Sequence, residues 1–117
     1  MKTSELTGAE LDWAVAMCEG YFDDDRAWIK EGRVEVAYYT GYSPSTDWAQ
    51  GGSIIERECI NLTYRHPNFT GLWTAFNDEW DDDKNGVNCG DTPLIAAMRC
   101  YVASKLGGEI ELPEGLK

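Results

Sequence analysis

Residues 91–108, DTPLIAAMRCYVASKLGG, contain the clearest helix pattern of the chain and anchor the interpretation of the rest. Thr92 stands at the N-cap position, where its side chain can bind a free backbone N–H. Pro93 follows at the first helical position, where a missing N–H costs nothing. The apolar positions that recur at helical spacing are Leu94, Met98 and Tyr101. They predict one buried face, and the glycine pair at 107–108 predicts the end of the helix.

A second helix is predicted near the start of the chain. Residues 7–10, Thr-Gly-Ala-Glu, have the spacing of a capping box, in which the Thr and Glu side chains each bind a free backbone N–H. Gly20 is suited to a left-handed conformation after the last turn. The apolar positions on one side are Leu11, Ala14, Val15 and Cys18. The pattern predicts a helix over about residues 8–19.

The segment between the two helices predicts strands and one long loop. Apolar and polar residues alternate over 34–39 and 60–64, and an apolar run covers 71–76, so three strands are expected. Residues 40–53 are rich in Gly, Ser and Thr and read as a loop, while 54–58 fit either a helical turn or a strand start. The predicted fold is a single α+β domain over residues 1–117, in α-β-β-β-α order. Both helices cover one face of an antiparallel sheet of three or more strands.

Composition excludes several classes of protein. Ten Lys and Arg against twenty-one Asp and Glu give a net charge of −11, which excludes a protein that binds nucleic acid mainly through phosphate contacts. No apolar run reaches the roughly 18–20 residues of a membrane span, and no signal peptide is recognisable, so we expect a protein of the cytoplasm that binds no membrane. The four cysteines lack zinc-ligand spacing and are expected to be free thiols.

The strongest candidate for a binding site is the Gly/Ser/Thr-rich loop at 41–53. Its small residues let backbone N–H groups approach an anion closely, and its tryptophan offers a ring for stacking. The loop residues expected to bind a ligand are Ser43, Ser45, Thr46, Trp48, Gln50, Gly51 and Gly52. Arg57 and the helix start at Thr92 are expected to add anion-binding groups. The alternative is a purely structural loop with Trp48 in the core.

Two further features of the sequence concern metal binding and catalysis. Asp81, Asp83 and Asn85, followed by Gly86, match the first half of a calcium loop, but position 12 falls on Thr92 instead of a bidentate glutamate. This Ca²⁺ candidate is therefore weak, and the alternative is a solvated turn. The sequence contains no nucleophile motif, so we predict a protein that is not an enzyme and needs no cofactor.

Three segments resemble the NinX-like proteins of lambdoid and related phages, a family of small accessory proteins known as a domain of unknown function. They are KTSELTG at 2–8, YSPSTDWAQGG at 42–52 followed by IIER at 54–57, and TPLIAAMR at 92–99. Ser53 stands where this family is expected to have a proline, and the acidic stretches 21–26 and 77–91 do not resemble it. The resemblance implies a phage origin and expression in the cytoplasm of the infected bacterial host. It supplies no activity.

These observations lead to one main functional hypothesis and one alternative. The first is a phage counter-defence protein, expected to form a homo-oligomer, that sequesters a small nucleotide-derived ligand, such as a host immune signal, without catalysis. The alternative is an acidic inhibitor or DNA mimic that blocks a host nucleic-acid-binding protein, because acidic stretches flanked by aromatic residues imitate the charge of DNA.

Overall fold

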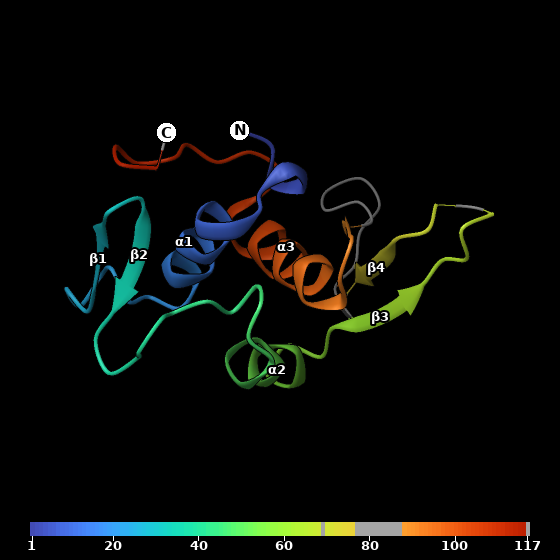
Figure 1. Ribbon diagram of the computed structural model, residues 1–117, viewed down its shortest axis with the longest axis horizontal. Coiled ribbons are helices and arrows are strands. Elements are labelled where there is room, and N and C mark those ends of the chain that lie inside the picture. Colours follow the sequence, from blue (N-terminus) through green and yellow to red (C-terminus); the bar gives the residue numbers. More distant parts are fainter. Residues whose placement is uncertain (69, 77–87, 117) are drawn as a thin grey trace.

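A computed structural model describes residues 1–68, 70–76 and 88–116 (Figure 1). The elements in chain order are η1 (Thr3–Glu5), α1 (Gly8–Cys18), β1 (Ala27–Lys30), β2 (Arg33–Val36), α2 (Trp48–Arg57), β3 (Asn61–Tyr64), β4 (Trp73–Phe76), β5 (Asn88–Gly90) and α3 (Pro93–Leu106). The small α+β class is confirmed, and none of the helices in these ranges is long and apolar enough to cross a membrane.

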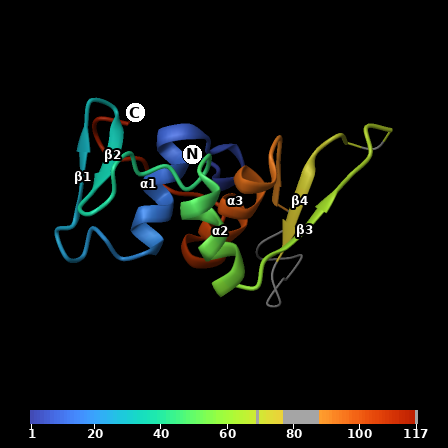
Figure 2. The same ribbon diagram turned by 60° about the horizontal axis from the view of Figure 1, so that its bottom comes forward.

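Helix α3 occupies the centre of the molecule. It packs against α1 and α2, against η1, and against all three strands of the β3–β5 sheet. The β1–β2 hairpin lies on the far side of α1, so the hairpin, α1, α3 and the sheet follow one another along the long axis (Figures 1 and 2). Most of α3 is buried, including Ala96, Ala97 and Met98 at its middle. The predicted buried positions Leu94, Met98 and Tyr101 are confirmed, but burial extends beyond one face because neighbours surround this helix.

The N-terminal cap predicted from the sequence is present in α3 but absent in α1. Thr92 caps α3 with its hydroxyl, which accepts a hydrogen bond from Ile95 N at 3.1 Å, and Pro93 is the first residue, as predicted. Helix α1 begins at Gly8 without the predicted capping box, because the Thr7 side chain forms no cap hydrogen bond. A positive φ of 56° at Gly8 turns the chain between Thr7 and the first helical turn. The first N–H groups of α1 therefore lack a side-chain cap.

The strands form two separate antiparallel sheets, so the predicted α-β-β-β-α arrangement is wrong. Within the described residues, β1 and β2 form a two-stranded sheet, and β3, β4 and β5 form a three-stranded sheet in that order. The hairpin closes through Glu31 and Gly32, whose φ angles of 53° and 76° match the two left-handed positions of a type I′ turn. This local turn pairs β2 with the segment just before it, and α2 then separates both strands from β3.

Helix α2 (Trp48–Arg57) occupies the last part, 48–53, of the segment 40–53 that the sequence predicts as a loop. Asp47 is its N-cap, since a side-chain oxygen accepts a hydrogen bond from Ala49 N at 2.9 Å. Gly51 lies against the Pro44 carbonyl and the side chain of Leu94, at a spacing that leaves no room for a Cβ. The glycines that suggested a loop thus include one that lets α2 approach α3 closely. The loop prediction is correct only up to the start of this helix.

We predict that Gly51→Ala destabilises the fold. An added Cβ would lie 2.4 Å from the Pro44 carbonyl oxygen and 2.6 Å from Leu94 Cδ2, so backbone must shift. Overpacking of this kind lowers the free energy of unfolding by about 1–3 kcal/mol. Gly52→Ala is the matched control, because the added Cβ would lie 3.8 Å from the Trp48 ring, an ordinary contact distance. Alanine also favours the helix over glycine by about 1 kcal/mol. Urea denaturation of both variants checks this, and equal stability would contradict the packing role of Gly51.

Candidate functional site

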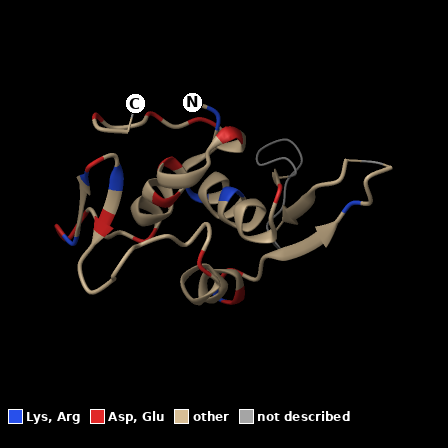
Figure 3. Ribbon diagram, viewed as in Figure 1, with Lys and Arg blue, Asp and Glu red and all other residues tan. Residues whose placement is uncertain are grey.

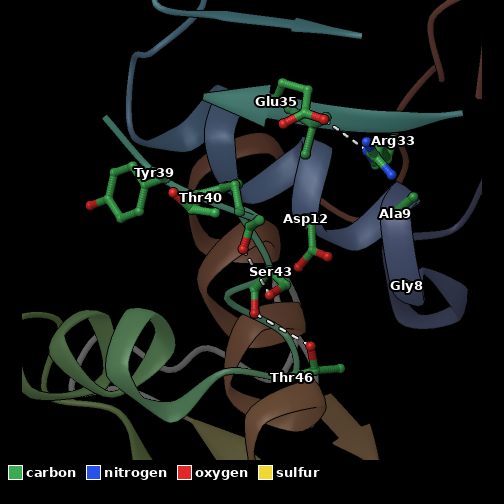
Figure 4. A pocket seen from close by; sticks show the side chains of 12 residues that line it. Gly8, Ala9, Asp12, Arg33, Glu35, Tyr39, Thr40, Ser43 and Thr46 are labelled. Carbon is green, nitrogen blue, oxygen red and sulfur yellow. Dashed lines mark hydrogen bonds and ion pairs between the residues drawn. The ribbon is translucent and has the colours of Figure 1, made fainter. Parts of the chain in front are cut away.

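A cleft of about 680 Å³ lies between the start of α1, strand β2 and the loop that joins β2 to α2 (Figure 4). Its lining residues are Gly8, Ala9 and Asp12 from α1, Arg33, Val34 and Glu35 from β2, and Tyr39, Thr40, Gly41, Tyr42, Ser43 and Thr46 from the loop. Its volume is within the usual range for sites that bind small molecules.

The carboxylate of Asp12 is the central polar group of the cleft. Its side chain points from α1 into the cleft (Figure 4), although the residue is only 7 % exposed. Oδ1 accepts a hydrogen bond from Ser45 N at 2.9 Å, which joins the loop to α1. Burial raises the pKa of Asp12 above its ordinary value, and the side chain and N–H of Ser45 lower it by less. The fold thus retains a carboxylate whose ionisation is disfavoured by burial.

The Ser45 hydroxyl lies beside this carboxylate. Its Oγ is buried and forms no hydrogen bond of regular geometry with any described residue, although it is close enough to lower the pKa of Asp12. Apart from the Ser45 N–H, no donor among the described residues binds the Asp12 carboxylate with regular geometry. The carboxylate therefore retains unused acceptor capacity toward the cleft.

The side chain of Gln50 fixes the conformation of the loop through hydrogen bonds to it. Its Oε1 accepts a hydrogen bond from Ser43 N at 2.7 Å, and its Nε2 donates to Gly41 O and to Asp47 Oδ2, both at 3.1 Å. All polar atoms of this side chain thus bind the protein itself. Gln50 lies outside the residues that line the cleft, and its predicted contact with a ligand stays a prediction.

Tyrosine rings form one end of the cleft. Tyr39 and Tyr42 pack edge to face with ring centroids 5.2 Å apart, and Tyr21 packs against both. Tyr42 is buried, whereas Tyr39 keeps 41 % of its surface exposed. Tyr38 comes directly before it with a φ of 73° and an exposed fraction of 97 %. A bulky residue in this backbone region costs about 1–3 kcal/mol, and such strain is concentrated at functional sites.

Arg33 marks the opposite end of the cleft. Its Nε lies 2.8 Å from Glu35 Oε1, and Figure 4 shows its side chain beside Ala9 at the start of α1. The uncapped N–H groups of the first turn of α1 and the Arg33 guanidinium both favour negative charge. The cleft thus has an aromatic end, a carboxylate near its middle and the Arg33–Glu35 ion pair beside the start of α1 at its other end.

The structure brings together only part of the predicted ligand-binding set. Ser43 and Thr46 line the cleft, and Ser45 lies behind them, 1 % exposed and bound to Asp12. The Ser43 hydroxyl donates to Gly41 O at 3.2 Å, and the Thr46 hydroxyl donates to Ser43 O at 3.5 Å. Their donors are therefore used within the loop, and their acceptor lone pairs remain.

The glycine and tryptophan positions lie on α2, outside the cleft lining. Trp48 is 55 % exposed, so the alternative that places it in the core is wrong, and its ring lies over Gly52. Gly51 is buried against Pro44 and Leu94. Their predicted contact with a ligand stays a prediction.

Arg57 lies at the end of α2, in a network with three helices. Its guanidinium forms two hydrogen bonds to the Glu19 carboxylate, at 2.8 and 3.2 Å, and others to Tyr101 and Glu58. These bonds raise the pKa of Arg57 and attach α2 to α1 and α3. A ten-residue helix is about 15 Å long, so Arg57 is well separated from Thr46 at the other end. Thr92 is the α3 cap, and its neighbours Asp91 and Ile95 line a different hollow with a volume of about 370 Å³.

The acidic candidates divide between described and undescribed parts of the chain. Asp81, Asp83 and Asn85 of the weak Ca²⁺ motif lie outside the described residues. Within the described ranges, no group of three or more His, Cys, Asp or Glu side chains is placed to hold a metal ion. Figure 3 shows the acidic residues spread over η1, α1, the hairpin, α2 and the C-terminal segment.

Sequence reasoning missed six lining residues with polar groups, of which Asp12 is the most informative; the others are Arg33, Glu35, Tyr39, Thr40 and Tyr42. It is the single acid in the run 11–16, LDWAVA, and the structure buries all six residues. An acid inside an apolar run was the available signal, because a buried carboxylate usually has a specific role. Arg33, Glu35 and Tyr39 gave no such signal, since they alternate along an ordinary strand and its exit.

We predict that Asp12→Asn stabilises the protein at pH 7. Burial raises the pKa of Asp12 in the folded protein above its ordinary value of 3.8. The protonated carboxyl therefore stabilises the fold fully below pH 3.8, and this stabilisation is lost as the pH rises through the folded pKa. Asparagine removes the charge and keeps an oxygen for the Ser45 N–H. Urea denaturation of both proteins should give a difference that grows from about pH 4 to pH 7. The stability of the variant minus that of the native protein should be larger at pH 7 than at pH 4. A smaller difference at pH 7 would contradict a cost of burying the charged carboxylate.

Comparison with known proteins identifies the family. None of the curated proteins matches the chain. A family model described as NinX of bacteriophage P22 matches residues 2–105, which is well over half of the chain, and this match confirms the resemblance. The chain therefore belongs to the phage P22 NinX family and is a phage protein.

Proposed function

We propose that this phage protein binds a small nucleotide-derived molecule in the cleft between α1, β2 and the 39–46 loop, and sequesters it without catalysis. The observation that carries the proposal is the Asp12 carboxylate, which is buried, points into the cleft and retains acceptor capacity. A buried carboxylate is costly to stability, and such costs are kept where a ligand repays them.

The rest of the lining supports a nucleotide. The exposed face of Tyr39 is suited to stacking on a base, and base–aromatic stacking is worth about 1–3 kcal/mol. The hydroxyl oxygens of Ser43 and Thr46 retain lone pairs that can accept hydrogen bonds from ribose hydroxyls. Arg33 and the uncapped start of α1 favour a phosphate at the other end. The net charge of −11 opposes an anion at long range, but salt screens that effect beyond about 8 Å.

The side chains of the described cleft lining favour binding of a ligand over its chemical conversion. The described cleft lining holds no Cys, Lys or His, and the hydroxyls of Ser43 and Thr46 donate to backbone carbonyls of the loop. Elsewhere, burial raises the pKa of Cys18 to about 12 and that of Cys100 to about 11, so both thiols are poor nucleophiles. A phage protein that captures a nucleotide signal of host immunity in the host cytoplasm, as a homo-oligomer, would act as a counter-defence protein.

The exposed aspartates at 23–25 are the basis of the alternative, an acidic inhibitor of a host nucleic-acid-binding protein. Asp24 already pairs with Arg26 at 2.6 Å, which reduces the local charge. The cleft therefore supports the binding proposal more strongly than this surface supports the alternative.

A thermal-shift panel tests the proposal. We expect one of a set of mononucleotides, cyclic dinucleotides and cyclic ADP-ribose isomers to raise Tm, because a ligand at about 100 times its Kd adds about 2.7 kcal/mol. Tyr39→Leu should remove the shift, since it removes the stacking ring of the cleft. Trp48→Ala is the matched comparison, because this exposed ring lies outside the cleft.

The two variants separate the possible sites. A shift that survives Tyr39→Leu but is lost in Trp48→Ala would move the ligand to α2, as the sequence alone predicts. A panel without any shift would contradict small-molecule binding, and Asp23→Asn with Asp25→Asn in a host-protein pulldown would then test the acidic surface.

A further inference from the structure

Four of the polar side chains that line the cleft offer hydrogen-bond acceptors: Asp12, Glu35, Ser43 and Thr46. The Ser43 and Thr46 hydroxyls use their hydrogens on backbone carbonyls, so they offer lone pairs. Glu35 offers carboxylate oxygens beside its ion pair with Arg33. The Asp12 carboxylate accepts one bond from Ser45 N and can accept more. A ligand that fills the middle of this cleft must therefore supply several donors.

We propose that the cleft selects guanine nucleotides, with the Asp12 carboxylate accepting the guanine N1–H and N2–H groups. This inference rests on the proposed function, since it names the base that the same site prefers. Guanine presents two parallel N–H donors on one edge, which match the two oxygens of a carboxylate. Adenine presents an acceptor beside its amino group, and uracil presents one donor between two acceptors, so each leaves an acceptor facing the carboxylate.

The position of Asp12 strengthens this selection. Only 7 % of the residue is exposed, so water competes poorly for its oxygens once a base covers the cleft. A base that fails to donate would leave a buried carboxylate unpaired, which is the condition that gives polar sites their strongest discrimination. Glu35 is a less suitable reader, because its negative charge is paired with the Arg33 guanidinium, whereas Asp12 forms no ion pair within the described residues.

Calorimetric titration of the whole protein with three 5′-monophosphates tests the proposal. Guanosine monophosphate should bind best, inosine monophosphate lacks the N2 amino group and should bind roughly tenfold more weakly, and adenosine monophosphate should bind more weakly still. Asp12→Asn should abolish the preference for guanine, because the amide places a donor where the base also donates. Its melting curve shows separately that the variant is folded.

Glu10→Gln is the matched control, because it removes a carboxylate from the same helix outside the cleft lining. It should keep the guanine preference. Equal affinity of the native protein for all three nucleotides would overturn the guanine proposal and leave the proposed function intact. Failure of every mononucleotide and cyclic dinucleotide to bind would contradict the proposed function itself. Binding of agmatine without guanosine monophosphate would overturn the proposal in favour of a cationic guanidinium ligand.

Discussion

Burial of α3 on most of its circumference is the constraint on which the rest of the structure depends. Small residues along the helix, such as Ala96 and Ala97, and glycines on its neighbours, at Gly51 and Gly90, allow backbone to approach backbone. A Cβ at Gly90 would lie 2.7 Å from Ala96 N, so the β5 edge depends on the same close packing. With α3 in the centre, α1 and α2 are fixed beside it, and the cleft forms where the loop between β2 and α2 crosses α1.

The sequence predicted the parts of the fold that depend on local chemistry. The Thr92 cap, the left-handed Gly20 and the strands around 60–64 and 71–76 are all present, since each is set by a few neighbouring residues. The layer order was not predictable in the same way. A helix surrounded by neighbours has no single apolar face, and a glycine pair in α2 looks like loop until its close contacts are known.

The site, like the fold, was predictable only where neighbouring residues in the sequence determine it. Ser43 and Thr46 were found because hydroxyls in a Gly-rich segment suggest binding, and they do line the cleft. The charge of Arg57 predicts an anion-binding role, yet its guanidinium pairs with Glu19 in another part of the fold. Asp12 is distant in sequence from the loop, so only the folded chain shows that its carboxylate receives the Ser45 N–H and faces the same space.

The claim that the ligand occupies this cleft is tested most directly by a ¹⁵N-resolved NMR titration of the whole protein with guanosine monophosphate. The account predicts that the amide signals of Ala9, Ser43 and Ser45 shift together with a single Kd, while those of Gly52 and Leu94 stay in place. Shifts confined to the start of α2 and α3, with the cleft signals unchanged, would contradict it.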